Sequence, residues 1–227
     1  MGAGPGAVAP PTSEQELLAR AMALVGRSLG DLAGTAGLAP PGASRHAKGY
    51  AGALLEMLLG ADAGSRPLPD FTHLHIELKS VPVNADGVPV ESTFLCVAPL
   101  RDALGLQFEE SPVWKKLARV LWVPIEAEPA LPLAARRIGW PLLWSPGPED
   151  VEILRADWEE LMELLTMDGQ AQLDARVGRY LQVRPKAANA RSVTRSHDAG
   201  GAPAATLPRG FYLRTRFTRR VLAGART

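Results

Sequence analysis

Cysteine is almost absent from this chain of 227 residues, which contains only Cys96. A single cysteine excludes an internal disulfide and a cysteine zinc cluster. Long apolar runs are also missing, and no stretch approaches the ~18 residues that a membrane helix requires. Residues 1–11 have no basic segment followed by an apolar run, so we expect no signal peptide. With 46% hydrophobic and 22% charged residues, the composition is globular, and we expect a soluble, cytoplasmic protein without membrane attachment.

Acidic residues are nearly missing from the last part of the chain. Residues 176–227 hold 12 Lys and Arg and one acid, Asp198, for a net charge of +11. Residues 1–175 hold 13 bases and 23 acids, for a net charge of −10. A polyanion such as DNA is the simplest partner for this basic segment, and its richness in Arg favours bidentate contacts with phosphates and bases. The alternative is a basic face that packs against the acidic part of the same chain.

Local patterns predict a mixture of helices and strands. A capping box at residues 13–16 precedes one helix, and further helices are expected near residues 29–36, 49–59, 112–119 and 148–167. Strands are expected over 71–83, 91–98, 120–125, 180–183 and 210–214. We expect the first two strands to be antiparallel across the turn at 84–87, the third to be an edge strand because it contains Pro124, and residues 196–205 to form a loop. These patterns indicate an α+β fold without regular βαβ alternation.

The first predicted strand carries charged residues that suit metal-dependent chemistry. Glu77 and Lys79 are two positions apart, so they share one face of the strand, and Asp70 stands at its entrance. Two carboxylates and a backbone carbonyl suit Mg²⁺, and a neighbouring lysine can orient a water for phosphodiester hydrolysis. A Glu-x-Lys pattern arises by chance about once in a chain of this length, so an exposed ion pair is the alternative.

Three further charged residues are candidates for the same site. Glu56 interrupts an otherwise apolar predicted helix, where a carboxylate is costly unless it is paired or bound to metal. This setting favours a functional role over a place on the solvent-facing stripe of the helix. Lys48 and Lys116 are candidates for contacts with the scissile phosphate, although each by itself is more typical of a surface lysine.

Several segments resemble the MutH family of DNA mismatch repair endonucleases, and the resemblance extends from about Ser13 to Thr218. The matching segments include Leu54-Leu55-Glu56, Pro69-Asp70, Glu77-Leu78-Lys79, Arg119-Val120-Leu121-Trp122, Asp157-Trp158-Glu159-Glu160-Leu161-Met162, Arg184-Pro185-Lys186-Ala187-Ala188-Asn189-Ala190 and Leu207-Pro208-Arg209-Gly210-Phe211-Tyr212-Leu213. The last two are far more specific than Glu-x-Lys alone.

The resemblance implies a restriction-endonuclease-like fold, in which a mixed sheet is flanked by helices and two arms surround a DNA-binding cleft. We therefore expect a flexible N-terminus over residues 1–12 and a single domain over 13–227. Within that domain we expect an acidic catalytic arm at about 13–110 and a DNA-reading arm at about 111–227, basic from 176.

The resemblance also implies an activity. It implies a monomer that nicks the unmethylated strand of double-stranded DNA 5′ to the G of hemimethylated GATC and that also has unmethylated GATC as a DNA partner. Mg²⁺ would be the cofactor, with Mn²⁺ or Ca²⁺ also accepted at the site. It implies activation by the mismatch-repair protein MutL after MutS has found the mismatch.

Carried over by position, the resemblance assigns the catalytic residues. Asp70, Glu77 and the backbone carbonyl of Leu78 become metal ligands, Glu56 becomes an auxiliary acid near the metals, and Lys79 becomes the water-orienting lysine. Phosphate-backbone contacts near the cut fall to Lys48 and Lys116. The family usually has an acid where this chain has Ala47, so the role of that acid is not carried over.

The same resemblance assigns the DNA-reading residues. Arg184, Pro185 and Lys186 would form the reading loop, and Tyr212 would lie beside the adenine whose methylation is sensed. Phe94 is a candidate for stacking on DNA, and a plain core phenylalanine is the alternative.

Two other functions remain open. A non-catalytic DNA-binding protein is disfavoured because the set of Asp70, Glu77 and Lys79 is intact. A restriction-type enzyme that cuts both strands of GATC would require two sites or a dimer, whereas the chain has one such set. His73 and His75 flank the first strand, but no His/Cys spacing suits zinc.

Overall fold

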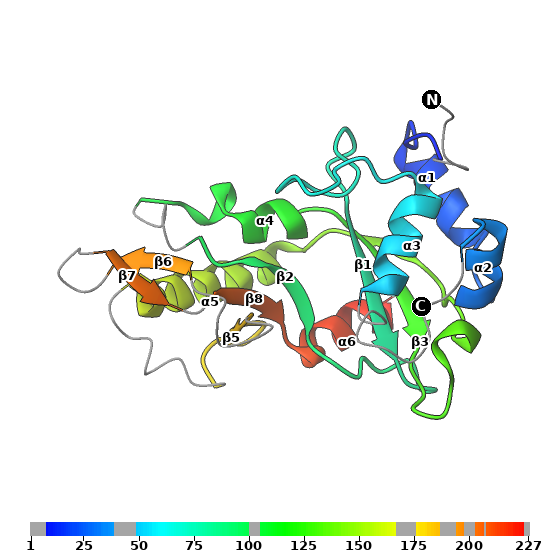
Figure 1. Cartoon of the computed structure of the whole chain (residues 1–227). Helices are drawn as coiled ribbons and strands as arrows, with labels where there is room; N and C mark the ends of the chain where they lie inside the picture. Colours follow the sequence, from blue (N-terminus) through cyan, green and yellow to red (C-terminus); the bar gives the residue numbers. More distant parts are fainter. Residues whose placement is uncertain are drawn as a thin grey trace. The chain divides into compact units, whose positions relative to one another are not determined.

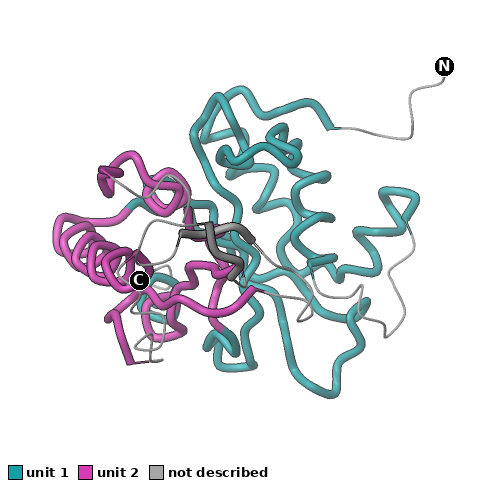
Figure 2. Tube along the Cα trace, turned by 60° about the vertical axis from the view of Figure 1, so that its left-hand side comes forward, with its two compact units in different colours: residues 1–91, 118–145, 219–227 teal, residues 92–117, 146–218 magenta. Residues whose placement is uncertain are grey.

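The computed structural model describes residues 8–38, 49–99, 105–166, 176–186, 194–197, 203–206 and 208–224. The chain forms two compact units (Figure 2). Unit 1 comprises Met1–Glu91, Ala118–Ser145 and Arg219–Thr227, and unit 2 comprises Ser92–Leu117 and Pro146–Thr218. Each unit is therefore assembled from segments that are distant in the sequence.

Unit 1 contains a three-stranded mixed sheet with helices packed against it (Figure 1). Its strand order is β1-β3-β4, with β1 parallel to β3 and β4 antiparallel to β3. The strands are β1 (Glu77–Val83), β3 (Val120–Glu126) and β4 (Leu142–Trp144). The helical elements are α1 (Glu14–Met22), α2 (Leu29–Thr35), α3 (Tyr50–Leu59) and the short 3₁₀ helix η3 (Leu133–Ala135).

Unit 2 contains an antiparallel sheet in the order β2-β8-β5. Its strands are β2 (Thr93–Val97), β5 (Leu181–Pro185) and β8 (Arg209–Leu213), and β6 (Thr194–His197) and β7 (Pro203–Thr206) form a separate antiparallel pair. Its helices are η2 (Phe108–Glu110), α4 (Pro112–Leu117) and α5 (Pro148–Thr166). Helix α6 (Thr215–Ala223) begins in unit 2 and ends in unit 1.

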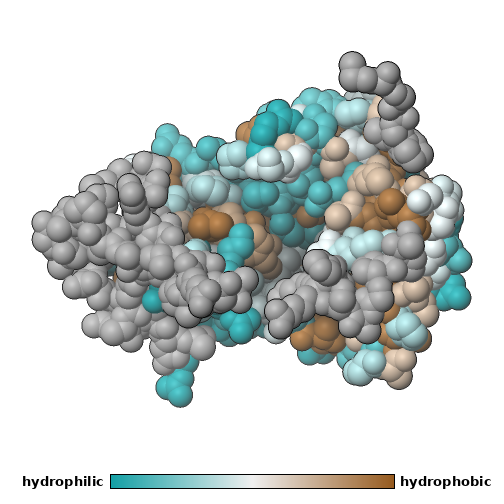
Figure 3. Space-filling model, in the orientation of Figure 1, coloured by the Kyte–Doolittle hydropathy of each residue, from teal (hydrophilic) through white to brown (hydrophobic). Residues whose placement is uncertain are grey.

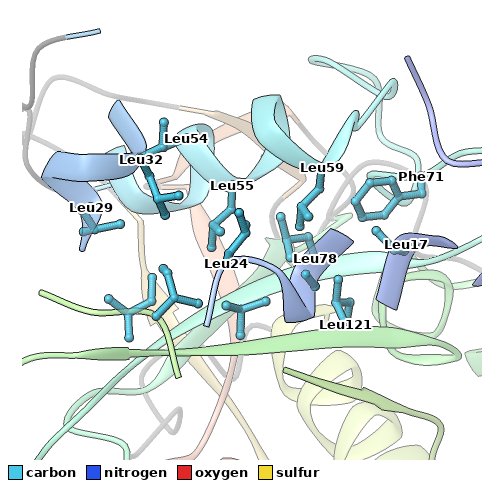
Figure 4. Close-up of a cluster of buried hydrophobic side chains, with 14 of the residues drawn as sticks. Leu17, Leu24, Leu29, Leu32, Leu54, Leu55, Leu59, Phe71, Leu78 and Leu121 are labelled. Carbon is cyan, nitrogen blue, oxygen red and sulfur yellow. The ribbon is translucent and has the colours of Figure 1, made fainter. Parts of the chain in front are cut away.

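One face of the unit 1 sheet is buried under α1, α2 and α3. Leu78 of β1 and Leu121 of β3 are register partners, and both belong to a buried cluster with apolar residues of the three helices (Figure 4). Figure 4 shows Leu59, at the end of α3, beside Leu78 and Phe71 near the start of β1. Apolar side chains of α3 also reach the outer surface of the same region (Figure 3).

Local signals explain where the helices start and stop. Ser111 caps α4, because its hydroxyl accepts a hydrogen bond from the N–H of Trp114 at 3.0 Å, and Pro112 occupies the first helical position. Helix α3 ends at Gly60, which has φ 81°, and a Cβ at this position would lie 2.5 Å from the carbonyl oxygen of Ala9. The predicted helices over 29–36, 49–59 and 148–167 are confirmed within one or two residues.

The first predicted strand is shorter than its alternation suggests. Residues 71–76 form a tight turn, closed by reciprocal backbone hydrogen bonds between Phe71 and Ile76 of 2.9 and 3.3 Å, and His75 has φ 55°. The extended strand begins only at Glu77. The prediction of a strand over residues 71–76, which rested on the alternation of Leu74 and Ile76 with polar residues, is therefore wrong. Local backbone hydrogen bonds hold this segment in a turn.

The predicted antiparallel hairpin is also wrong. The turn at 84–87 exists, since Gly87 N–H donates to Asn84 O at 2.8 Å, but the chain returns along β1 only as far as Val90, whose N–H donates to Pro82 O. It then enters unit 2, where β2 pairs with β8. The β1 strand instead pairs with β3, in parallel.

Three smaller expectations are corrected. The strand over 120–125 is central rather than at an edge, because β3 pairs with β1 on one side and with β4 on the other. Pro124 is tolerated there because β4 pairs only with Val120–Trp122. The ends of the expected loop at 196–205 belong to the paired strands β6 and β7. Ser13 caps α1, but the Glu16 carboxylate accepts hydrogen bonds from Thr12 rather than completing the capping box.

Within the described ranges, no helix is long and apolar enough to cross a membrane.

Candidate active site

The start of β1 brings Asp70, Glu77 and Lys79 together. Leu78 N–H donates a hydrogen bond of 2.8 Å to Asp70 Oδ2, so the Asp70 carboxylate lies beside the first residues of the strand. The carbonyl oxygen of Asp70 accepts hydrogen bonds from the N–H groups of Asp62 and Ala63 at 2.9 and 3.2 Å. The loop at 62–70 therefore holds the backbone that carries this carboxylate.

Glu77 and Lys79 form a close ion pair. The Lys79 ammonium lies 2.5 Å from Glu77 Oε1, and the two side chains are only 13% and 2% exposed. Their register partners on β3, Val120 and Trp122, are fully buried. Burying a carboxylate is costly unless it is paired, and Lys79 supplies that partner for Glu77 at the start of the strand.

Glu56 lies on helix α3, which covers one face of β1. Helix α3 covers the face that carries Leu78 and Ser80, since a Cβ on Gly52 would lie 3.5 Å from Ser80 Oγ. Glu56 is one turn beyond Gly52 on the same stripe of α3 and is half-buried. Glu77 and Lys79 lie on the opposite face because side chains alternate along a strand. The auxiliary role of Glu56 remains a prediction.

Of the two lysines predicted to contact phosphate, Lys116 and Lys48, the structure describes only Lys116. Lys116 is half-buried on α4 in unit 2, whereas the carboxylates belong to unit 1. Lys48 lies outside the described residues. The contacts predicted for both lysines remain predictions.

The donor set at the start of β1 fits a hard divalent cation. In the part of the chain that the structure describes, no three His, Cys, Asp or Glu residues gather as a metal cluster. The protein ligands would be the carboxylates of Asp70 and Glu77 and the carbonyl of Leu78. Mg²⁺ commonly takes only one or two carboxylates from a protein and completes its octahedron with water and substrate phosphate oxygens. The residues present therefore fit Mg²⁺ better than a metal that is fully enclosed by protein.

Four of the five residues predicted to read DNA lie on one face of the unit 2 sheet. By alternation and register, Phe94 on β2, Arg184 on β5 and Gly210 and Tyr212 on β8 share this face, and Lys186 follows β5 in the same phase. The opposite face carries residues that are fully buried: Leu181, Phe211 and Leu213. Pro185 is exposed at the end of β5. The sheet thus presents a polar and aromatic face and buries an apolar one.

On that face two aromatic rings lie between two cations. The Arg184 guanidinium lies 5.8 Å from the centre of the Tyr212 ring, and the Tyr212 and Phe94 ring centres are 5.2 Å apart in an edge-to-face arrangement. The Lys186 ammonium lies 4.1 Å from the centre of the Phe94 ring. Burial there lowers the pKa of Lys186. Phe94 is half-buried, which places it between the two alternatives of a stacking residue and a core residue.

Sequence reasoning assigned no role to Asp157, which holds the segment that leads into β5. Its carboxylate is 5% exposed and accepts hydrogen bonds from the N–H groups of Arg179, Tyr180 and Leu181. The carbonyl of Leu181 in turn accepts from Arg214 Nε at 3.2 Å. Asp157 lies within one of the segments that resemble the MutH family. One acid among many on an acidic helix does not indicate from sequence that it accepts backbone hydrogen bonds from residues 179–181.

A mixed sheet flanked by helices, with Asp70, Glu77 and Lys79 gathered at the start of a strand, fits the restriction-endonuclease-like class that the resemblance implies. Comparison with known proteins narrows the class. The family described as "DNA mismatch repair enzyme MutH" matches residues 59–157. A DNA mismatch repair protein MutH from Vibrio cholerae is 54% identical over 212 residues, which cover 93% of this chain and 96% of the relative.

Other relatives agree over the same extent. The DNA mismatch repair protein MutH of Yersinia enterocolitica is 53% identical over 215 residues, covering 95% of this chain and 94% of its own. The protein of the same name from Escherichia coli is 51% identical over 216 residues, with the same two coverages of 95% and 94%. The chain therefore belongs to the MutH family, which confirms the resemblance seen in its motifs.

Proposed function

We propose that this DNA mismatch repair endonuclease nicks the unmethylated strand of double-stranded DNA 5′ to the G of hemimethylated GATC, and that it requires Mg²⁺. The observation that carries the proposal is the buried ion pair of Glu77 and Lys79 beside the Asp70 carboxylate, in a chain of the MutH family.

The residues at the start of β1 would divide the work. Asp70, Glu77 and the Leu78 carbonyl would hold Mg²⁺, with Glu56 as an auxiliary acid. The bound ion supplies Lewis acidity, which lowers the pKa of water and stabilises charge on the phosphate. Lys79 is held by Glu77 at 2.5 Å, so its ammonium has a fixed place from which to orient the attacking water. Lys48 and Lys116 would contact the phosphate backbone near the cut.

DNA reading would fall to the polar face of the unit 2 sheet. Arg184 and Lys186 would reach base edges, Tyr212 would lie beside the adenine, and Phe94 would stack. The net charge of +11 over residues 176–227 would supply phosphate contacts that do not depend on sequence. Binding should therefore weaken with salt by a slope of about −0.9 in log K per neutralised phosphate.

The proposal extends to partners and cofactors. The protein would act as a monomer in the cytoplasm, activated by MutL after MutS has found a mismatch, and Mn²⁺ or Ca²⁺ would also occupy the site.

A plasmid nicking assay tests the chemistry. Supercoiled plasmids with unmethylated, hemimethylated or fully methylated GATC are incubated with Mg²⁺ and with wild type, Asp70→Asn, Glu77→Gln or Lys79→Met. We expect each variant to lose at least about 100-fold in nicking rate, because each removes a group worth several kcal/mol in the transition state. Asp86→Asn is the matched control, since Asp86 is an exposed acid of the same unit in the turn after β1. It should nick at the wild-type rate.

The outcomes separate the proposed features. Near wild-type nicking by Glu77→Gln or Asp70→Asn would overturn the metal assignment, and linear product from wild type would indicate a double-strand cutter. Equal nicking of all three methylation states would remove strand discrimination. DNA binding should remain largely intact in the carboxylate variants, so that their loss of nicking cannot be explained by a loss of affinity for DNA.

A further inference from the structure

Gly210 lies directly beneath the two aromatic rings of the DNA-reading face. A Cβ built on Gly210 would lie 2.9 Å from Phe94 Cε2 and 3.2 Å from Tyr212 Cε2. Its backbone is outside the left-handed region, so its conformation does not require glycine. What demands glycine here is space. A methyl group would have to displace one or both rings, because protein interiors leave little room for an added carbon.

The Phe94 and Tyr212 rings, which pack over Gly210, are part of a continuous stack of four side chains. Along it the order is Arg184, Tyr212, Phe94 and Lys186, with successive separations of 5.8, 5.2 and 4.1 Å. The rings therefore hold the two cations at opposite ends. Arg184 is tied down further by a hydrogen bond of 2.9 Å from Nη1 to Ser92 Oγ.

The backbone around Gly210 is shaped to bring the rings together. The pairing of β2 with β8 shifts register between Phe94 and Cys96, which places Phe94 opposite Tyr212. Such a bulge re-aims a side chain without breaking the sheet. On the other side of β8, Arg184 is the register partner of Gly210. The side chains that form the stack thus come from all three strands and converge on the one position that lacks a side chain.

We propose that Gly210 is a positioning residue for DNA reading, which sets the spacing of the Arg184–Tyr212–Phe94–Lys186 stack before DNA arrives. Cations that are already held on rings lose less conformational freedom when they meet base edges, so a preformed stack favours specific binding. The inference rests on the proposed function for the DNA sequence that is read, but the stack itself is a property of the free protein.

The first test is DNA binding by Gly210→Ala. All charges remain in this variant, so affinity for a scrambled site and its salt slope should stay within about twofold of wild type. Affinity for GATC should fall about tenfold, the size expected when one or two base contacts are misplaced. Gly34→Ala is the matched control, because it adds the same methyl group on α2 where no atom lies within 4 Å. It should bind like wild type.

A double variant separates crowding from general damage to the sheet. A Phe94→Leu background removes the ring that makes the one contact under 3.0 Å, and Tyr212 Cε2 at 3.2 Å and Cys96 O at 3.3 Å remain. Adding Gly210→Ala there should therefore lower GATC affinity by about threefold relative to Phe94→Leu alone, clearly less than its roughly tenfold loss in wild type. If Gly210→Ala does not fold, the double variant should fold. A double variant that stays unfolded, or that loses as much again as Gly210→Ala loses in wild type, would overturn the role of ring crowding.

A second readout needs no DNA. Lysines are converted to ¹³C-dimethyl-lysine, which keeps the charge, and the Lys186 signal is assigned by its loss in Lys186→Arg. That signal should be shifted by the Phe94 ring in wild type, should lose the shift in Phe94→Leu, and should move clearly in Gly210→Ala. An unmoved signal together with unchanged GATC affinity in Gly210→Ala would overturn the proposal. A wild type without preference for GATC would overturn the proposed function instead, and the lysine signal would still decide the stack.

Discussion

Replacing Asp157 should destabilise the protein more than replacing any exposed acid on the same helix. Its two carboxylate oxygens accept hydrogen bonds from three backbone N–H groups. Oδ1 accepts from Arg179 at 2.6 Å, and Oδ2 accepts from Leu181 at 2.8 Å and also from Tyr180. Each buried donor left without an acceptor costs about 1–3 kcal/mol, less where water reaches it. We therefore expect Asp157→Ala to lower the free energy of unfolding by about 4 kcal/mol. Asp157→Asn keeps one acceptor oxygen and should cost about 2 kcal/mol.

Urea unfolding followed by far-UV circular dichroism and tryptophan fluorescence measures both losses. The neighbouring Trp158 on α5 is 4% exposed, so its emission should report unfolding of this region. Glu160→Gln is the control, because Glu160 is exposed on the same helix, and it should change stability by less than about 0.5 kcal/mol. If both Asp157 variants stay within about 1 kcal/mol of wild type at unchanged m-value, the three hydrogen bonds do not anchor this segment.

Two further predictions concern unit 1. Gly60→Ala should lower the free energy of unfolding by about 2 kcal/mol in urea, since φ is 81° and the new Cβ would meet Ala9 O at 2.5 Å; a change no larger than that of Gly34→Ala would contradict this. Hydrogen bonds from the Thr12 hydroxyl and N–H, with Arg20, lower the pKa of Glu16 to about 2. This stabilisation is therefore complete above pH 4.5, the ordinary pKa, and is lost as pH falls towards 2. Thr12→Val should raise that pKa in a carboxyl NMR titration, and an unchanged pKa would refute the role of the hydroxyl.

Helix positions could be predicted because their signals are local. Ser111-Pro112 caps one helix and Gly60 ends another, and both effects act within a few residues. The closeness of Glu77 and Lys79 could also be predicted from sequence, because side chains two positions apart share a face wherever the segment is extended.

Strand pairing could not be predicted in the same way. The turn at 84–87 favoured a hairpin, but the pairing of β2 with β8 depends on residues 209–213, which no local pattern connects to Thr93–Val97. Pro124 suggested an edge strand, yet β4 is short enough to leave that proline outside its pairing. The role of Gly210 was equally hidden, since it depends on two rings, one of them on another strand.

The long-range pairing of β2 with β8 has a consequence for synthesis on the ribosome. Strand β2 emerges more than a hundred residues before β8 completes its ladder. At about 5–20 residues per second, the hydrogen-bonding edge of Thr93–Val97 waits roughly 5–20 s for its partner. The nascent chain therefore passes through a period in which a strand containing Phe94, Leu95 and Val97 lacks its native ladder, and during this period chaperones or neighbouring chains compete with the native fold for it.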